Sequence, residues 1–205
     1  MPEPRPLPDD LAGRPFDRAA LVERRRSKGR ATRKDLVHPL HGVHSSVAPT
    51  TLLERCRAYA VRMRPGRSFC HATAAQLRGM PLPVRLQQSD PLHVAAVRPA
   101  SPPRTRGVIG HRLSLPPVVQ DLDGLVVCAP SEAWVQLGDE LDLDELVEIA
   151  DHLLTVSPLD PGASAADSIR NAAGRRRRDE VSHSAADSHP LARQVPAANP
   201  RYVTE

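Results

Sequence analysis

The stretch VVQDLDGLVVCAPSEAWVQLGDELDLDELVEIADHLL, residues 118–154, carries the clearest fold signals of this 205-residue chain. Its first part places Asp121-Leu-Asp-Gly124 between two apolar segments, which is typical of a β-hairpin turn. Further on, Asp142 and Glu145 have the spacing of a helix capping box. The helix predicted from there has an apolar stripe at helical spacing, made of Leu143, Leu146, Val147, Ala150, Leu153 and Leu154.

Segments on the N-terminal side of this stretch predict the rest of the same domain. Thr51 and Glu54 have capping-box spacing at the start of a predicted helix. One face of this helix carries Leu52, Cys56, Tyr59 and Met63. We also predict an extended piece and a short helix over residues 68–80, strands over 92–97 and 108–115, and a helix over 131–137. The predicted fold class is α+β: one small mixed domain, residues 35–157, with a short antiparallel sheet and flanking helices.

The two ends of the chain lack such patterning. The chain contains 22 prolines, and only 2% of its residues are aromatic. We predict that residues 1–34 form a disordered, basic segment with a short helix near residues 18–26. The apolar period stops near residue 158, so residues 158–205 are predicted to be a disordered tail, apart from a short helix near 165–173.

A cationic stretch near the N-terminus is the best candidate binding site. The net charge of +4 is modest, so the distribution of charge matters more than its sum. Closely spaced arginines and lysines neutralise successive phosphates and release counterions. This stretch therefore predicts nucleic-acid contact, and the alternative of a solvated basic tail stays open. We call it the basic run: Arg24, Arg25, Arg26, Lys28, Arg30, Arg33 and Lys34.

Three other patterns contain residue types found in reactive or metal-binding sites. His38, His41 and His44 recur every three residues, but Pro39 and Gly42 disfavour a helix, and a strand would place His41 on the opposite face. Adjacent Cys70 and His71 in an extended segment should also point to opposite faces, which excludes a nucleophile–base pair. Asp121-x-Asp123 is explained by turn chemistry. We predict no catalytic residues, no metal and no cofactor.

The sequence lacks features of secreted and membrane proteins, and this predicts the cellular location. No signal-peptide pattern opens the chain, and no apolar run approaches the ~20 residues that span a bilayer. The three cysteines, Cys56, Cys70 and Cys128, are far apart and odd in number. Buried, reduced thiols and a cytoplasmic protein with no membrane partner are the expectation.

Several stretches in a fixed order resemble a known family. They are HPLHGVHSS (38–46), SFCHATAAQLRGMPLP (68–83), LHVAAV (92–97), RGVIGHRLSLPP (106–117) and residues 118–154. Together they resemble the AbiEi-type antitoxin-like region of actinobacterial proteins, over roughly residues 33–157. The resemblance implies a winged-helix module that enters DNA, of which residues 36–46 match only the wing-like end, followed by an α/β domain.

The C-terminal part departs from this family. Many family members continue into a Vsr-like endonuclease domain of the PD-(D/E)xK class, whose carboxylates hold a catalytic metal. This chain has no Asp/Glu-x-Lys, because Arg26 and Thr32 stand two residues before its lysines. We hypothesise that a frameshift or truncation near Gly174 has removed the nuclease domain.

The leading prediction is a non-enzymatic, antitoxin-like protein that binds DNA through the basic run or binds a toxin partner. One alternative is a member of the endonuclease family, whose metal site would need Asp121, Asp123, Asp142 or Asp144. Another is an interaction module that binds a partner through the acidic face of the helix after Asp142.

Overall fold

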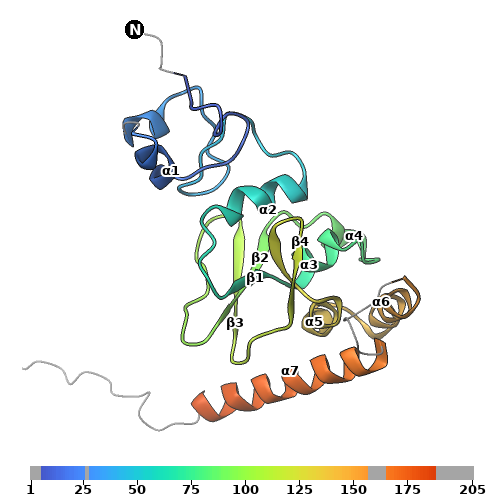
Figure 1. Cartoon of the computed structure of the whole chain (residues 1–205). Helices are drawn as coiled ribbons and strands as arrows, with labels where there is room; N and C mark the ends of the chain where they lie inside the picture. Colours follow the sequence, from blue (N-terminus) through green and yellow to red (C-terminus); the bar gives the residue numbers. More distant parts are fainter. Residues whose placement is uncertain (1–5, 26–27, 157–164, 188–205) are drawn as a thin grey trace, which may run out of the picture.

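The computed structural model describes residues 6–25, 28–156 and 165–187. A twisted five-stranded sheet lies at its centre, with α2 on one side and α5, α6 and α7 at the opposite end (Figure 1). The strands are β1 (Arg67–Phe69), β2 (Leu92–Val97), β3 (Val108–Leu113), β4 (Val119–Leu122) and β5 (Leu125–Cys128). The helices around them are α2 (Leu52–Ala60), α3 (His71–Leu77), α4 (Val84–Gln87), α5 (Pro130–Gln136), η2 (Leu137–Asp139), α6 (Leu143–Val156) and α7 (Ala165–Asp187).

The sheet has the order β3-β2-β1-β5-β4. Strand β1 pairs antiparallel with β2 and parallel with β5, whereas β2 and β3 are parallel and β4 and β5 antiparallel. The α+β class is confirmed, but the sheet is mixed rather than antiparallel. Parallel pairing needs a crossover, and the proline-containing segment between β2 and β3 supplies one. Phe69, Val94 and Val127, from the three central strands, are fully buried in the main core.

The β4–β5 hairpin confirms the turn prediction. Leu122 pairs with Leu125, so the loop has two residues, Asp123 and Gly124, both with positive φ (52° and 80°). Two positive φ angles define the type I′ turn that matches strand twist. The Asp121 Oδ1 accepts the Gly124 N–H at 3.0 Å, which closes the turn.

Both predicted capping boxes are present. The Thr51 hydroxyl accepts the Glu54 N–H at 3.2 Å, and the Glu54 carboxylate accepts the Thr51 N–H at 3.0 Å. At α6, the Asp142 carboxylate accepts the Glu145 N–H at 2.9 Å, and Glu145 accepts the Asp142 N–H at 3.1 Å. These bonds satisfy backbone donors that a helix start leaves open.

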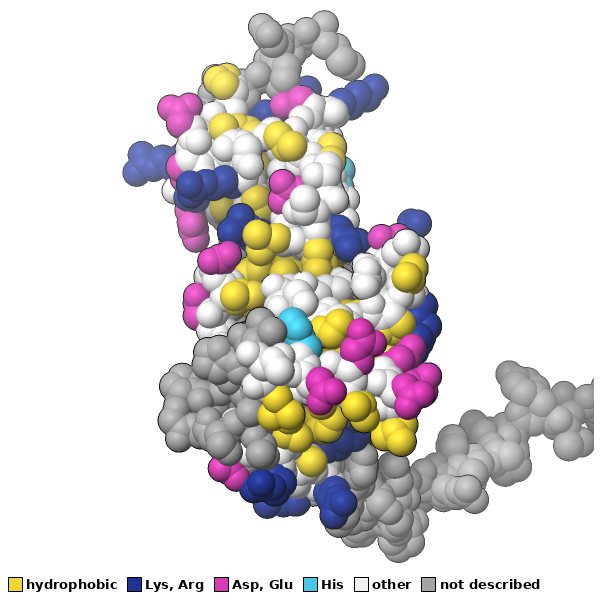
Figure 2. Space-filling view, turned by 90° about the vertical axis from the view of Figure 1, so that its right-hand side faces the viewer, with side chains coloured by type: hydrophobic (Ala, Val, Ile, Leu, Met, Phe, Trp, Pro, Cys, Tyr) yellow, Lys and Arg dark blue, Asp and Glu magenta, His cyan; other side chains and the backbone are white. Residues whose placement is uncertain are grey.

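The predicted apolar stripe of α6 is only partly correct. Ile149 and Leu153 are buried, whereas Leu143, Val147 and Leu154 are 74%, 49% and 52% exposed. Helix α6 packs on α5 and α7 rather than on the sheet, so it buries a narrower line than the sequence pattern suggests. Figure 2 shows hydrophobic side chains beside acidic ones on this side of the molecule.

Helix α7 begins where a short helix was predicted, near residues 165–173, but it continues to Asp187 and so corrects the prediction of disorder for residues 174–187. The rest of 158–205 lies outside the described residues. The apolar residues of α7 show almost no helical periodicity, so the sequence pattern did not predict its full length. Small residues, Ser168 and Ala172, are buried against α5 and α6, and the helix continues through Gly174. Further along α7, Arg175 binds Glu132 of α5 and Arg176 binds Asp139 of η2.

An N-terminal lobe, residues 6–25 and 28–46, contains α1 (Arg18–Glu23) and η1 (Lys28–Thr32). The lobe lies beyond α2 (Figure 1). Its small core differs from the disorder predicted for residues 1–34, because backbone bridges Phe16–His44 and Val37–Ser45 tie the segment to residues 37–45. The core consists of Leu11, Phe16, Leu21, Ala31 and Leu36. Before Asp35, the described part of the lobe has no helix besides α1 and η1, so the three helices of a winged-helix module are not seen there.

None of the described helices combines the length and apolar character that a bilayer-spanning segment requires. The three cysteines are buried and free of disulfides, as the sequence predicted.

Candidate functional site

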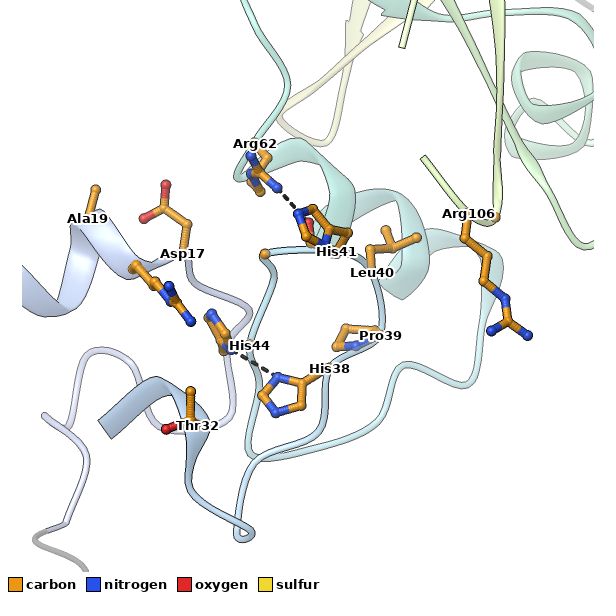
Figure 3. A pocket seen from close by; sticks show the side chains of 13 residues that line it. Asp17, Ala19, Thr32, His38, Pro39, Leu40, His41, His44, Arg62 and Arg106 are labelled. Atoms are coloured by element: carbon orange, nitrogen blue, oxygen red, sulfur yellow. Dashed lines mark hydrogen bonds between the residues drawn. The ribbon is translucent and has the colours of Figure 1, made fainter. Parts of the chain in front are cut away.

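A pocket of about 890 Å³ lies between the N-terminal lobe and the sheet domain, residues 52–156 (Figure 3). Three arginines line it from separate elements: Arg18 at the start of α1, Arg62 just after α2, and Arg106 in the turn before β3. The loop 38–44 contributes His38, His41 and His44. We call it the lobe pocket.

The loop 38–44 is held in place by backbone contacts at both ends. Phe16 and His44 exchange two backbone hydrogen bonds, each of 2.8 Å. Gly42 has a φ of +74°, which glycine adopts without strain. Across the pocket, the Arg62 Nη1 donates to the His41 carbonyl oxygen at 2.6 Å, as the dashed line in Figure 3 shows. This bond connects Arg62, which belongs to the sheet domain, to the loop of the N-terminal lobe.

His44 brings an unsatisfied polar atom to the pocket. The residue is only 5% exposed, and its Nε2 is buried without a hydrogen-bond partner. Its Nδ1 lies 2.9 Å from the Nδ1 of His38, so one of these two atoms carries the hydrogen. Burial lowers the pKa of His44, and the nearby charges of His38 and Arg18 lower it further. In the neutral tautomer whose Nδ1 accepts from His38, the Nε2–H is an unused donor.

The pocket has a positive potential. Within the described ranges, no carboxylate lies within 4.0 Å of the guanidinium of Arg18, Arg62 or Arg106. Asp17 is the one acidic lining residue, and its Oδ1 is already bonded to the Ala20 N–H at 2.9 Å as the cap of α1. Arginine donors around a buried imidazole suit an anion with several oxygen acceptors.

The basic run lies next to this pocket, and the structure divides it into two groups. Arg24 donates to Asp10 at 2.6 Å, and Arg30 donates to both oxygens of Asp35 at 2.9 and 2.6 Å. These two side chains are engaged within the lobe, and hydrogen bonding from Arg30 lowers the pKa of Asp35. Of the other members, Arg25, Arg33 and Lys34 are exposed, while Arg26 and the side chain of Lys28 lie outside the described residues.

The acids considered for a nuclease site are placed in local structure. Asp121 closes the hairpin turn, and Asp142 caps α6. Asp123 and Asp144 are exposed in the same turn and the same helix. In the part of the chain that the structure describes, these acids form no group of three metal-ligand candidates, and neither do His38, His41 and His44.

Sequence reasoning missed the three pocket arginines. They are separated by more than forty residues each, and each is an ordinary surface arginine in its own segment. Only the histidine spacing marked the loop, and it pointed to a metal rather than to an anion. Comparison with known proteins found no family model and no curated protein that matches this chain.

Proposed function

We propose that this chain binds nucleic acid through the phosphate backbone, with one phosphate held in the lobe pocket. The supporting observation is that Arg18, Arg62 and His44 line one pocket, and that the Nε2 of His44 has no hydrogen-bond partner. Besides burial, the charges of both arginines contribute to lowering the pKa of His44. Arginine binds phosphate with two parallel donors, and a neutral imidazole N–H adds a third.

The surroundings of the pocket extend this cationic surface. Thr32 lines the pocket at the end of η1, and the exposed Arg33 and Lys34 follow it directly. A phosphate in the pocket would therefore have neighbouring phosphates within reach of the basic run. Contacts to phosphates position a nucleic acid but do not distinguish its bases. We therefore expect the chain to bind nucleic acid with little sequence preference.

The antitoxin-like role, the AbiEi resemblance and a toxin partner stay predictions. The proposal needs only that the chain holds nucleic acid and leaves its covalent bonds unchanged.

The test is fluorescence anisotropy of a short labelled DNA duplex over about 50 to 200 mM salt. The double variant Arg18→Gln/Arg106→Gln removes two pocket charges and spares Arg62, which also holds the loop. Each lost phosphate contact should lower the slope of log affinity against log salt by about 1. Arg57→Gln removes an exposed arginine of α2 outside the pocket and is the matched control.

Because the pocket holds one phosphate, the expected result is a slope smaller by about 1 for the double variant and a lesser change for the control. Equal effects of the two variants would overturn the assignment of the pocket. Absent or salt-independent binding by the unaltered chain would overturn the proposed function. A parallel Arg33→Gln/Lys34→Gln variant measures how much the basic run contributes to the salt dependence of DNA binding.

A further inference from the structure

A second polar site lies at the other end of the sheet, away from the lobe pocket. A pocket of about 410 Å³ opens between β3, α5 and α7. Its wall includes His71, His111 and Gln136 together with two charged pairs, Arg175–Glu132 and Arg176–Asp139. The proposed nucleic-acid function uses none of these residues.

Three histidines from three elements gather there. In the parallel register of β2 and β3, His111 stands opposite Ala95, two residues beyond His93, so both histidines lie on one face of the sheet. The Nδ1 of His93 is 3.0 Å from the Nε2 of His111. The ring of His71, at the start of α3, stacks on His111 with centroids 3.6 Å apart.

Cys70 completes the cluster. Its Sγ and one ring nitrogen each of His71 and His111 all lie within 4.8 Å of one another. This corrects the expectation that Cys70 and His71 point to opposite faces. That expectation assumed an extended chain, whereas Cys70 is the N-cap of α3 and His71 has a φ of +47°. A positive φ is strained for histidine and is often kept at functional sites.

The state of these groups is suited to a metal ion. His71 Nδ1 is buried without a hydrogen-bond partner, so this nitrogen is not engaged by any other group of the protein. A neutral imidazole nitrogen of this kind is what binds a metal. The nearby guanidinium charges are offset, since Arg175 pairs with Glu132 and Arg176 with Asp139.

We propose that Cys70, His71 and His111 form a binding site for a divalent transition metal of the zinc type. One thiolate and two imidazoles form a ligand set that binds zinc or cobalt, whereas magnesium and calcium prefer oxygen ligands. Three protein ligands leave a fourth position for water, and two of the three, His71 and His111, line the pocket. His93 contacts His111 from the side, as the outer partner of a metal-bound histidine does.

Binding requires small rearrangements. Ligands 2.0 to 2.3 Å from one ion lie roughly 3.3 to 3.8 Å apart, so atoms that now lie within 4.8 Å of one another must move closer together. The rings of His71 and His111 are stacked, and the lone pair of an imidazole nitrogen lies in the plane of its ring. For both nitrogens to point at one ion, one ring must turn about its Cβ–Cγ bond. The Cys70 thiol loses its proton to solvent as the metal–sulfur bond forms.

The test is titration of the full chain, stripped with a chelator, with Co²⁺ as a spectroscopic probe. The expected result is saturation at one ion per chain, with the intense visible bands of a tetrahedral site and a thiolate-to-cobalt charge-transfer band. Excess Zn²⁺ should remove both signals. Cys70→Ser should abolish the charge-transfer band, and His111→Gln should weaken binding at least tenfold.

Two matched controls separate this cluster from other groups. Cys56→Ser changes a buried cysteine elsewhere in the core, and His38→Gln changes the histidine loop of the lobe pocket; both should keep the full signal. Circular dichroism confirms that each variant is folded, and the partly buried His111 gives a second variant if Cys70→Ser unfolds. No saturable uptake by the folded chain, or an unchanged charge-transfer band in Cys70→Ser, would overturn the site.

Discussion

The ion pair between α7 and α5 provides a sharp test of how the last described helix is held. The Arg175 Nε donates to the Glu132 Oε1 at 2.5 Å, and the side chains are 25% and 7% exposed. Removing one partner of a buried pair costs about 3 to 5 kcal/mol, since a charge stays buried without compensation. Arg175 is a quarter exposed, and Glu132 also accepts weakly from the Val118 N–H at 3.4 Å. For Arg175→Ala we therefore expect a loss of about 2 kcal/mol.

The measurement is urea unfolding at neutral pH, followed by far-UV circular dichroism and by the fluorescence of Trp134, the single tryptophan. Trp134 reports on this region because it lies on α5, beside residues of α7. The matched control is Arg170→Ala, on the same helix, which removes an exposed pair with Asp167. Exposed pairs contribute about 0 to 1 kcal/mol, so the control should change little.

A double variant separates the buried charge from the loss of packing. Glu132→Gln in the Arg175→Met background removes both charges, and replacing both partners of a buried pair is close to neutral. We expect the double variant to regain most of the stability that Arg175→Ala loses. Equal losses in Arg175→Ala and Arg170→Ala would refute the reasoning that Glu132 needs its guanidinium.

Three further predictions concern local features. Hydrogen bonding from Arg85 lowers the pKa of Glu145 from 4.5 to about 2. This pair therefore stabilises the fold above pH 4.5 and loses that effect as the pH falls toward 2. When the urea midpoint of unfolding is measured over this pH range, it should fall less for Arg85→Gln than for the unaltered chain. Gly110→Ala should cost about 1 to 3 kcal/mol in urea unfolding, because its Cβ would overlap the backbone of Pro103; an unchanged midpoint would contradict this. Thr51→Ala removes a helix cap and should lower the unfolding free energy by about 1 kcal/mol, with Thr51→Ser as the variant that keeps it.

The parts of the fold that follow local rules were predictable. The β4–β5 turn and the starts of α2 and α6 depend on residues within four positions of one another, and each has the predicted hydrogen bonds. Strand β2 was predicted with the bounds that the structure has. Local side-chain chemistry decides such features, so a single sequence contains them.

Features that depend on distant partners were not predictable in this way. Helix α7 has almost no apolar face, and its place depends on Glu132 and Asp139, about forty residues earlier. The lobe pocket needs the bridge between Phe16 and His44 before its arginines can meet. At Cys70 the period-two rule failed, because the backbone turns at His71. For α7 and the lobe pocket the deciding contact comes from another segment of the chain, whereas at Cys70 it is a local backbone conformation.

The molecule has two separate hydrophobic cores, one in the lobe and one around the sheet. Arg18 and His44 belong to the first unit, whereas Arg62 and Arg106 belong to the second. An anion that touches residues of both units would couple their unfolding, since neither could then open without losing the ligand. Occupancy of the space between them would thus convert two loosely linked folding units into a single cooperative one.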